Sequence, residues 1–304
     1  MTDIPSDVTI GPWRRGLDEG QTAAAQALFA RVRAHDSLAP ETPPGGDTDV
    51  LPAHVAGALV GLAYRRGADP AELYVDPAYR GRGIGRELAR ATVADITRPS
   101  GIWAHGTLPV ARHLAAAFGA VPTRELRQLR RSVESLRATP LPVDLPSGVG
   151  IRTFRPGVDD DAFLAVNARA FAWHPEQGRL DAAGLRAEMA QPWFDPAGFF
   201  LAVTKGNTAG TINTVGTVLG FHWTKVHREE TPPLGEVYVL GVDPSSPIKH
   251  LGTPLTATGL NHLAARGIDT VLLYVEGDNE RAVNLYRRFG FADYAVDTVY
   301  PERQ

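Results

Sequence analysis

The sequence predicts an α/β fold of two tandem domains, each a mixed, mostly antiparallel sheet flanked by helices. Two observations lead to this prediction. Residues 73–85 (LYVDPAYRGRGIG) and 240–252 (LGVDPSSPIKHLG) share Leu, Val-Asp-Pro and the last Gly in one register, a little over half of the 304-residue chain apart. Around each of these turns, strand-like segments alternate with helix-like segments. A strand–helix–strand order implies parallel pairing, whereas consecutive strands imply antiparallel pairing, so each half should contain both.

In the first half, strands are predicted where apolar residues alternate, and helices where Ala and Leu recur at helical spacing. An Ala-rich helix is expected from about Asp18 to His35, and another from Arg86 to about Ile96, directly after the turn. Residues 37–53, rich in Pro and Gly, are expected to form a long loop. The other elements predicted here are strands at 8–13, at 60–64 and up to Val75, and a helix at 111–120.

The second half repeats this order. VGIRTF at 149–154 alternates as a strand does, and the acidic run that begins DDDAFL at 159 starts a helix. LGFHW at 219–223 matches the strand at 60–64, and AVNLYRRFGF at 282–291 matches the helix at 111–120. The second half is therefore expected to have the same fold as the first.

The predicted boundary between the domains is proline-rich. Residues 138–148 (ATPLPVDLPSG) contain three prolines between two periodic segments. Such a composition favours a semi-rigid, extended connector. We therefore predict an N-terminal domain at 1–140 and a C-terminal domain at 149–304.

Composition narrows the class of protein. A hydrophobic content of 43% with 21% charged residues is ordinary for a globular protein, and the net charge of -3 gives no basic footprint for nucleic acid or an anionic membrane. We find neither a membrane-spanning apolar run nor a signal-peptide pattern at the N-terminus. The chain has no cysteine, which excludes disulfides, thiolate nucleophiles and cysteine-type zinc sites. We predict a cytoplasmic monomer that binds small molecules, without nucleic acid, membrane or metal.

The turn at 73–85 has the chemistry of a phosphate seat. Arg80-Gly81-Arg82-Gly83-Ile84-Gly85 joins a strand to a helix, and its glycines let the backbone approach a ligand closely. The free N–H groups at a helix start attract anions, and arginines add fixed charge. The spacing of the glycines does not fit a dinucleotide fingerprint, and the Gly-Lys-Ser/Thr ending of a P-loop is absent.

Arg80-x-x-Gly83-x-Gly85 resembles the acetyl-CoA pyrophosphate loop of the GNAT acetyltransferases. In the second half, Asn279, Ala282, Leu285-Tyr286 and Phe289-Gly290-Phe291 have the spacing of another GNAT signature, and the two resemblances cover nearly the whole chain as tandem copies. In that family the Asn contacts the CoA arm and the Tyr protonates the departing thiolate. The resemblance implies the following acetyl-CoA contacts: Leu73, Tyr74, Val75, Arg80, Gly81, Arg82, Gly83, Ile84, Gly85 and Arg86 in the first half, and Leu240, Gly241, Val242, Pro247, Ile248, Lys249, His250, Leu251, Gly252, Thr253, Asn279, Arg281, Ala282 and Asn284 in the second.

Further motifs resemble one tandem GNAT family more closely, the mycothiol synthases, which acetylate the cysteinyl amine of a cysteine–glucosamine–inositol conjugate. The motifs are HPEQG at 174–178, GFHWTKVH at 220–227, GEVYVLGVDP at 235–244, LYVEGDN at 273–279 and AVDTVYP at 295–301. The resemblance implies that Asp36, Glu176, Lys225, Glu236 and Tyr274 contact this substrate, with Asp36 reaching across from the first half. From the residues alone, Glu176 and Lys225 are equally compatible with solvated charges, and Tyr274 with a core aromatic.

The second half is the predicted catalytic half. Ala115 stands where the second copy has Tyr286, and alanine cannot donate a proton. Acyl transfer to an amine needs a base for the ammonium and an acid for the leaving thiolate. We assign Glu236 as the base and Tyr286 as the acid. His105 and His113 of the first half are interpreted as surface or packing histidines, and that half as an acetyl-CoA-binding or structural domain.

The second turn is eroded. Pro247 replaces the arginine, and Ile248 and His250 replace glycines, so one backbone donor is lost and positive φ is disfavoured. Lys249 keeps a charge, and Thr253-Pro254 is expected to cap and start the next helix. A weakened acetyl-CoA site is the prediction. The alternatives are a tandem GNAT enzyme acting on another small amine, such as an aminoglycoside or polyamine, and a non-catalytic acyl-CoA-binding protein.

Overall fold

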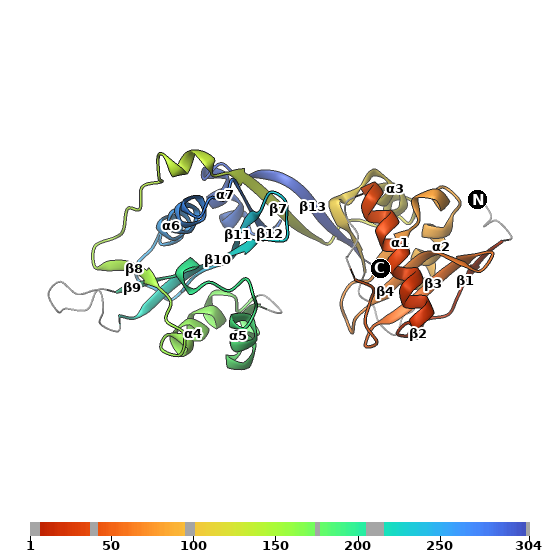
Figure 1. Ribbon diagram of the computed structural model, residues 1–304, viewed down its shortest axis with the longest axis horizontal. Helices are drawn as coiled ribbons and strands as arrows, with labels where there is room; N and C mark the ends of the chain where they lie inside the picture. The colour runs from red at the N-terminus through yellow and green to blue at the C-terminus, as the bar shows by residue number, and fades with distance from the viewer. Residues whose placement is uncertain (1–6, 37–41, 95–100, 174–176, 205–215, 302–304) are drawn as a thin grey trace. The chain divides into compact units, whose positions relative to one another are not determined.

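The computed structural model describes residues 7–36, 42–94, 101–173, 177–204 and 216–301 (Figure 1). The chain forms two compact units. Unit 1 is Met1–Arg127 with Glu276–Asp278 and Ala295–Gln304, and unit 2 is Gln128–Val275 with Asn279–Tyr294. These units do not coincide with the predicted boundaries at 1–140 and 149–304. Two strands, β7 (Arg124–Ser132) and β13 (Ala292–Tyr300), each begin in one unit and end in the other, which a sequence repeat alone does not reveal.

Unit 1 contains an antiparallel sheet in the order β1-β3-β4-β5, with β2 paired to β3. Strand β6 pairs with the end of β13, from Thr298–Ala104 to Tyr300–Ile102. The bounds are β1 (Val8–Ile10), β2 (Arg14–Arg15), α1 (Glu19–Asp36), β3 (Asp49–Val55), β4 (Ala58–Arg65), β5 (Glu72–Val75), α2 (Ile84–Val93), β6 (Ile102–Ala104) and α3 (Pro109–Ala117).

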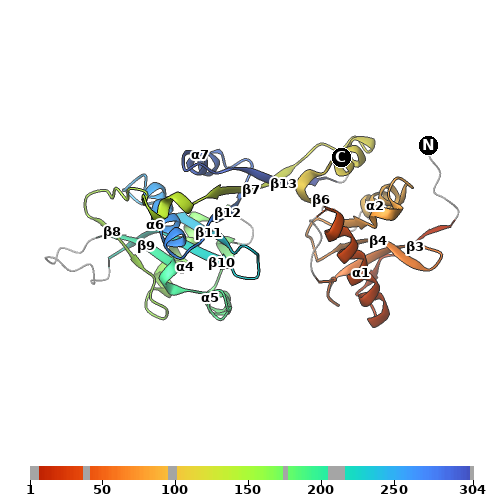
Figure 2. The ribbon, with the colours of Figure 1, turned by 45° about the horizontal axis from the view of Figure 1, so that its top comes forward.

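Alternating residues of these strands bury opposite faces of the sheet, as the two-residue period of a strand requires. Val50, Leu62 and Tyr74 pack with Leu28 and Phe29 of α1. The neighbouring residues Leu51, Ala63 and Val75 pack instead with Ile84 and Leu88 of α2. Figure 2 shows these two helices on either side of β3 and β4. The arrangement places the start of α2, and with it the first turn, at the carboxyl end of β5.

The predicted loop at 37–53 is too long. Residues 37–41 lie outside the described residues, and β3 begins at Asp49. Pro52 lies within this strand, where its carbonyl accepts a hydrogen bond from the Gly11 amide at 2.8 Å. Proline content indicated a loop, but a proline carbonyl still accepts hydrogen bonds. The residues around Pro52 are buried on opposite faces of the sheet, Val50 on one and Leu51 and Ala53 on the other, as in a strand that is covered on both sides.

Unit 2 contains a mixed sheet in the order β7-β12-β11-β10-β9-β8. The strands β8 to β11 are antiparallel, and β12 runs parallel to β11. The bounds are β8 (Val149–Thr153), α4 (Asp160–Ala170), α5 (Ala182–Met189), β9 (Phe199–Thr204), β10 (Val218–His227), β11 (Leu234–Val242), α6 (Gly252–Ala265), β12 (Thr270–Glu276) and α7 (Glu280–Arg288). The mixed sheet flanked by helices confirms the predicted fold class.

Two hydrophobic clusters cover the two faces of this sheet. On one face, Phe163 of α4 contacts the rings of Phe199 and Phe221 at 5.0 and 4.8 Å between centroids, and Trp223 stacks on Phe199 at 4.6 Å. On the other face, Leu260 of α6 belongs to a cluster with residues of β11, β12 and α7. Figure 1 shows α6 and α7 on one side of the strands and α4 and α5 on the other.

The segment at 138–148 is part of unit 2 and packs against its helix α6. Asn261 of α6 bonds both to the amide and to the carbonyl of Leu141, at 2.8 and 2.9 Å. Leu145 packs beside a cluster that contains Leu251 and Leu255. The proline-rich segment is therefore held along α6 by hydrogen bonds and apolar contacts.

Candidate active site

Strands β11 and β12 separate along their length. In the part of the chain that the structure describes, their parallel pairing runs from Leu234–Thr270 to Glu236–Leu272. Strand β11 then continues to Val242, and β12 to Glu276, outside this register. Open α/β sheets bind ligands at the carboxyl ends of such strands. Glu236 stands at the last paired position, where the opening between the strands begins.

Glu236 is buried and bonded to a histidine. It is 7% exposed, and its Oε2 lies 2.7 Å from Nε2 of His227 on the neighbouring strand. Lys225 is its direct cross-strand partner. The carboxylate therefore contacts the His227 imidazole, and its residue faces Lys225 across the strand pair.

A β-bulge in β11 changes the direction of its side chains immediately after this position. Trp223 pairs with Val239 but Thr224 pairs with Val237, so Tyr238 is the extra residue. Bulges of this kind redirect side chains and occur next to active sites. Here the bulge brings Tyr238 to the same side as Lys225, whose Nζ lies 5.3 Å from its ring centroid and 4.8 Å from that of Trp193.

Tyr286 approaches the opening from the opposite face. It lies on α7, is 6% exposed, and packs with Val237 of β11, Leu273 of β12 and Phe291. Burial raises the pKa of this phenol well above its usual value, so it stays protonated at neutral pH. Asn279 caps the start of α7, because its side chain accepts a hydrogen bond from the Ala282 amide at 3.1 Å.

The second turn keeps part of the shape of the first. His250 has a φ of 65°, in the left-handed region, and Gly83 at the corresponding position of the first turn has a φ of 81°. Helix α6 begins at Gly252 with Leu251 as the N-cap and without a capping side chain, so the predicted cap at Thr253 is wrong. The left-handed residue turns the chain into the helix earlier than the Thr-Pro pair suggested.

Contacts within the second turn occupy two of its donors. The Ile248 amide donates to Oγ of Ser246 at 3.1 Å, and Nζ of Lys249 donates to the carbonyl of the same serine at 2.7 Å. Beside the turn lies a cavity of about 700 Å³. Its lining includes His250 and Thr253 of the turn, the arginines Arg131 and Arg288, and one acid, Asp144.

The other predicted residues of unit 2 are placed as follows. Leu240, Gly241 and Val242 form the end of β11. Arg281 and Asn284 lie exposed on α7, at a surface hollow of about 600 Å³, and Ala282 is partly buried. Tyr274 is 48% exposed on β12 and receives a hydrogen bond from the Gln128 side chain at 2.6 Å, so it is not a core aromatic. Glu176 lies outside the described residues.

Unit 1 has a comparable opening, which forms a cavity. Ala71, the residue before β5, forms a parallel bridge with Ile102 of β6, and the two strands then belong to different sheets. A cavity of about 400 Å³ lies between them. Its lining includes the predicted contacts Leu73, Tyr74, Val75, Arg80, Gly81, Gly83, Ile84, Gly85 and Arg86, together with Ala115 and Tyr300. Arg82 is exposed, with its guanidinium 5.0 Å from the Tyr79 ring centroid.

Arg80 is held by an acid. Its guanidinium bonds to both oxygens of Asp36, at 3.0 and 2.5 Å, and its Nε donates to the Val75 carbonyl at 3.1 Å. The hydrogen bond from Arg80 holds the pKa of Asp36 below its usual value. Arg80 therefore fixes the shape of the first turn, and Asp36 lines the cavity of unit 1. The role of Asp36 as a substrate contact stays a prediction.

Gly83→Val should abolish CoA binding in unit 1 and leave turnover largely intact. A β-branched residue resists a φ of 81°, with a strain of about 1–3 kcal/mol, and the turn then loses its close approach to a phosphate. Calorimetry with CoA checks the first expectation and an acetylation assay the second. Gly57→Val is the matched control, because Gly57 has a φ of 83° and, like Gly83, an open surround. Turnover lost in a folded Gly83→Val chain would make unit 1 catalytic or coupled.

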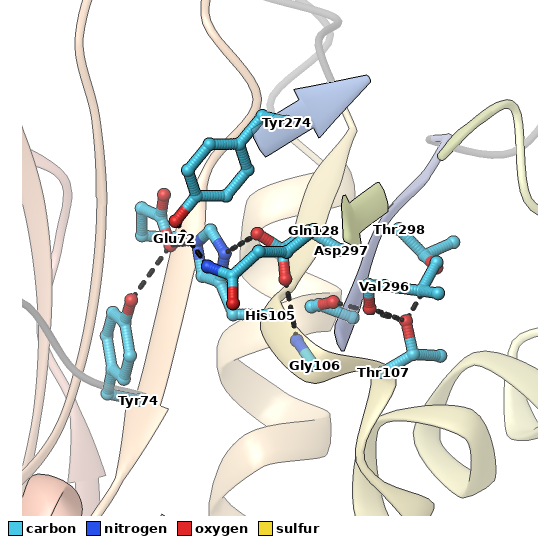
Figure 3. A network of polar contacts seen from close by, with 11 residues as sticks. Glu72, Tyr74, His105, Gly106, Thr107, Gln128, Tyr274, Val296, Asp297 and Thr298 are labelled. Atoms are coloured by element: carbon cyan, nitrogen blue, oxygen red, sulfur yellow. Dashed lines mark hydrogen bonds and ion pairs between the residues drawn. The ribbon is translucent and has the colours of Figure 1, made fainter. Parts of the chain in front are cut away.

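A partly buried polar network adjoins this cavity through His105 and Tyr74 (Figure 3). Nε2 of His105 lies 2.8 Å from Glu72, and its Nδ1 lies 3.0 Å from Asp297 of β13. Glu72 also accepts from the Tyr74 hydroxyl at 3.0 Å, and Asp297 from the Gly106 amide at 2.7 Å. His105 is thus a structural histidine that links β5 to β13 through two carboxylates, and it is not a free surface group.

The network predicts a pH dependence of stability. Burial opposes charging of His105, but its hydrogen bonds to Asp297 and Glu72 raise its pKa to about 10. A raised pKa stabilises the folded state fully below the unfolded value of about 6.5, and this stabilisation is lost as pH rises to 10. In the wild type, the free energy of unfolding should therefore decline by on the order of a few kcal/mol as pH rises through this range, and His105→Gln should remove this decline. Hydrogen exchange of the β5 and β6 amides measures the free energy of unfolding across this pH range. An unchanged decline in His105→Gln would contradict the stabilising role of His105. His113→Gln is the control, because His113 is exposed on α3.

Sequence reasoning missed several polar residues of both openings. His227, Trp193 and Tyr238 surround the positions of Lys225 and Glu236, and His105 with Asp297 lies at the cavity of unit 1. One signal was available: His227 follows Lys225 by two residues, and on a strand such residues share a face. The His105–Asp297 pair joins positions far apart in sequence and left no such signal.

Comparison with known proteins identifies the class. A model described as "Acetyltransferase (GNAT) domain" matches residues 48–119, and one described as "Acetyltransferase (GNAT) family" matches residues 166–291. A GCN5-related N-acetyltransferase from Sphaerobacter thermophilus has a TM-score of 0.69 at 19% identity, with 99% of this chain and 98% of that chain covered. A tandem GNAT protein from the clavulanic acid biosynthesis pathway has a TM-score of 0.64 at 17% identity, with 97% of each chain covered. Both halves therefore have the GNAT acetyltransferase fold.

Relatives of higher identity narrow the family. The mycothiol acetyltransferase of Streptomyces coelicolor is 50% identical over 249 residues, which cover 80% of this chain and 76% of that protein. That of Nocardia farcinica is 44% identical over 308 residues, which cover 97% and 98%. The chain belongs to the mycothiol acetyltransferases, tandem GNAT enzymes that use acetyl-CoA.

The described residues contain neither a candidate membrane span nor a candidate metal site. In that part of the chain, no helix has the length and apolar character needed to cross a membrane. Within the same residues, no three histidine, aspartate or glutamate side chains are grouped as metal ligands.

Proposed function

We propose that unit 2 transfers the acetyl group of acetyl-CoA to the cysteinyl amine of a cysteine–glucosamine–inositol conjugate, which gives mycothiol. Family membership supports this substrate. One structural observation supports unit 2 as the catalytic unit: a buried carboxylate, Glu236, and a buried phenol, Tyr286, border the opening between β11 and β12 from opposite faces. The residue aligned with Tyr286 in unit 1 is Ala115, which has no proton to donate.

In this reaction the substrate arrives as an ammonium ion. Glu236 accepts one N–H proton, and the electron pair left on nitrogen attacks the thioester carbonyl carbon. A C–N bond forms, the C–S bond breaks with its electrons on sulfur, and Tyr286 donates its O–H proton to the thiolate. The phenolate regains a proton from the new amide nitrogen. One proton in total passes to Glu236 and then to water.

Acetyl-CoA is proposed to lie in the opening, with its pyrophosphate at the second turn. The uncapped start of α6 supports this site, because its amides and the helix dipole favour anions. Arg131 and Arg288, in the cavity beside the turn, supply the positive charge that Pro247 removed. The contacts proposed from resemblance are Leu240, Gly241, Val242, Pro247, Ile248, Lys249, His250, Leu251, Gly252, Thr253, Asn279, Arg281, Ala282 and Asn284.

The polar substrate is proposed to contact Lys225, Glu236 and Tyr274 of unit 2, whereas the contacts of Asp36 and Glu176 stay predictions from the resemblance. Lys225 is pre-positioned by two aromatic rings, and Tyr274 is exposed on β12 beside the opening. We further propose that the chain acts as a cytoplasmic monomer and binds neither nucleic acid nor membrane. Its mass in solution tests the oligomeric state.

A panel of amines tests the function. The wild type is incubated with acetyl-CoA and the cysteinyl conjugate, an aminoglycoside or a polyamine, and the acetylated product is identified by mass. We expect acetylation of the cysteinyl amine and little of the others. Product from another amine alone would assign a different acetyltransferase activity, and acetyl-CoA binding without any product would indicate a non-catalytic binding protein.

A further inference from the structure

The proposed base has a second titratable group directly behind it. His227 lies at the end of β10, and both of its ring nitrogens contact carboxylates: Nε2 is 2.7 Å from Glu236, and Nδ1 is 3.0 Å from Glu229. An imidazole between two acceptors donates from both nitrogens only as the imidazolium. The neighbouring carboxylates therefore favour the charged form of His227.

Exposure increases stepwise along this line of groups. The side chain of Glu236 is 10% exposed, that of His227 is 21% exposed, and that of Glu229 is 69% exposed. A proton taken up in the opening thus has a continuous hydrogen-bonded route to water. Hydrogen bonds at 2.7 and 3.0 Å are short enough for transfer at each step.

We propose that His227 and Glu236 accept the substrate proton as one pair, with His227 setting the basicity of the pair and carrying the proton outward. This inference rests on the proposed function. An isolated carboxylate has a pKa of about 4.3 and is a weak base for an ammonium ion. A pair that shares its proton with an imidazole matches an amine better.

The proton passes from the substrate through Glu236 and His227 to water in steps that balance. An N–H bond of the substrate breaks, with its electron pair left on nitrogen, and an O–H bond forms on Glu236. The proton moves to Nε2 of His227, which gives imidazolium and carboxylate. The imidazolium then releases one proton to water on its Glu229 side, and the remaining ring proton returns to Nδ1. This restores the starting state of the pair, a Glu236 carboxylate beside a neutral His227 imidazole with a free Nε2 and a net charge of −1.

The charged groups that face His227 agree with this role. Among the described residues these are Glu236 on β11, Glu229 in the loop after β10, and Lys225 on β10. The hydrogen bond to Glu236, opposed by partial burial and aided by Glu229, raises the pKa of His227 above its usual value. Lys225 acts in the opposite direction but does not reverse the shift.

His227→Gln tests the pair through the pH profile of kcat at saturating substrates. In the wild type, kcat should rise with pH, and this rising limb of the profile should lie above pH 6.5, because the pair must first lose its proton. In the variant that limb should move to lower pH by more than 1 unit, and plateau kcat should fall roughly 10- to 100-fold. Glu229→Gln should move the limb in the same direction by less. His54→Gln, on β3 of unit 1, is the matched control and should leave the profile in place.

A readout independent of turnover completes the test. In an NMR titration, the pKa of His227 should fall by at least 1 unit in Glu236→Gln relative to wild type. Two results would overturn the inference. One is an active wild type and a His227→Gln variant with the same rising limb of the pH profile, and the other is an unchanged His227 titration in Glu236→Gln. A wild type that releases no CoA with the cysteinyl amine would instead overturn the proposed function, whatever the titration shows.

Discussion

Tyr286→Phe is expected to lower kcat by roughly 10²- to 10⁴-fold, the range for a positioned general acid. The change removes only the hydroxyl, so the ring keeps its contacts with Val237, Leu273 and Phe291. Because burial raises the pKa of the phenol, the wild type keeps its donor proton throughout the neutral range. Steady-state CoA release with the cysteinyl amine measures the effect.

The control for this substitution is Tyr294→Phe. Tyr294 lies on β13, is 63% exposed, and stacks with the Arg130 guanidinium 3.5 Å from its ring centroid. The same chemical change there should leave kcat within about 2-fold of wild type, since surface substitutions away from a site have small effects. Wild-type turnover in Tyr286→Phe would remove Tyr286 from the chemistry.

Glu236→Gln is expected to lower kcat by a similar factor, roughly 10²- to 10⁴-fold. The amide has the same shape as the carboxylate but cannot accept the ammonium proton. It also leaves His227 without its charged partner, so the fall in kcat reflects the loss of the His227–Glu236 pair as well as the loss of the carboxylate. Rates at fixed pH with both substrates saturating give the comparison.

Glu134→Gln serves as the control for this loss of charge. Glu134 is exposed in the short 3₁₀ helix Glu134–Arg137 of the same unit. Its replacement removes one carboxylate from unit 2 without touching the opening, and kcat should stay at its wild-type value. A Glu236→Gln chain that turns over as fast as this control would show that another group takes the proton.

Local patterns predicted most of the secondary structure, because they depend on residues close in sequence. The helix expected from Asp18 to His35 is α1 at Glu19–Asp36, and the strand expected at 149–154 is β8. The exchange of β7 and β13 between the units was not predictable in this way. Asp297 acquires its partner His105 only when β13 pairs with β6, and no periodicity encodes that pairing.

The second turn shows the limit of arguments from residue type. Loss of its glycines suggested loss of its backbone shape, yet His250 adopts the left-handed conformation of the glycine that it replaces. Such a conformation is uncommon outside glycine, although histidine is among the residues that tolerate it better. The surrounding contacts of Ser246, Ile248 and Lys249 stabilise the turn, and these depend on the folded chain.

The two openings differ at the aligned pair Tyr286 and Ala115. In unit 2, the tyrosine ring packs with residues of both separating strands. In unit 1, alanine leaves a cavity between β5 and β6, with an intact glycine turn at its edge. We therefore propose that unit 1 binds acetyl-CoA without catalysis, and that unit 2 combines a less regular turn with the acid and the base.

The measurement that tests the central claim most directly is CoA release from acetyl-CoA and the cysteinyl–glucosaminyl–inositol amine, by the wild type and by the double variant Glu236→Gln, Tyr286→Phe. We predict one N-acetylated product per CoA released by the wild type, and a rate near background in a folded double variant that still binds acetyl-CoA. Wild-type rates in the double variant would contradict the assignment of catalysis to unit 2.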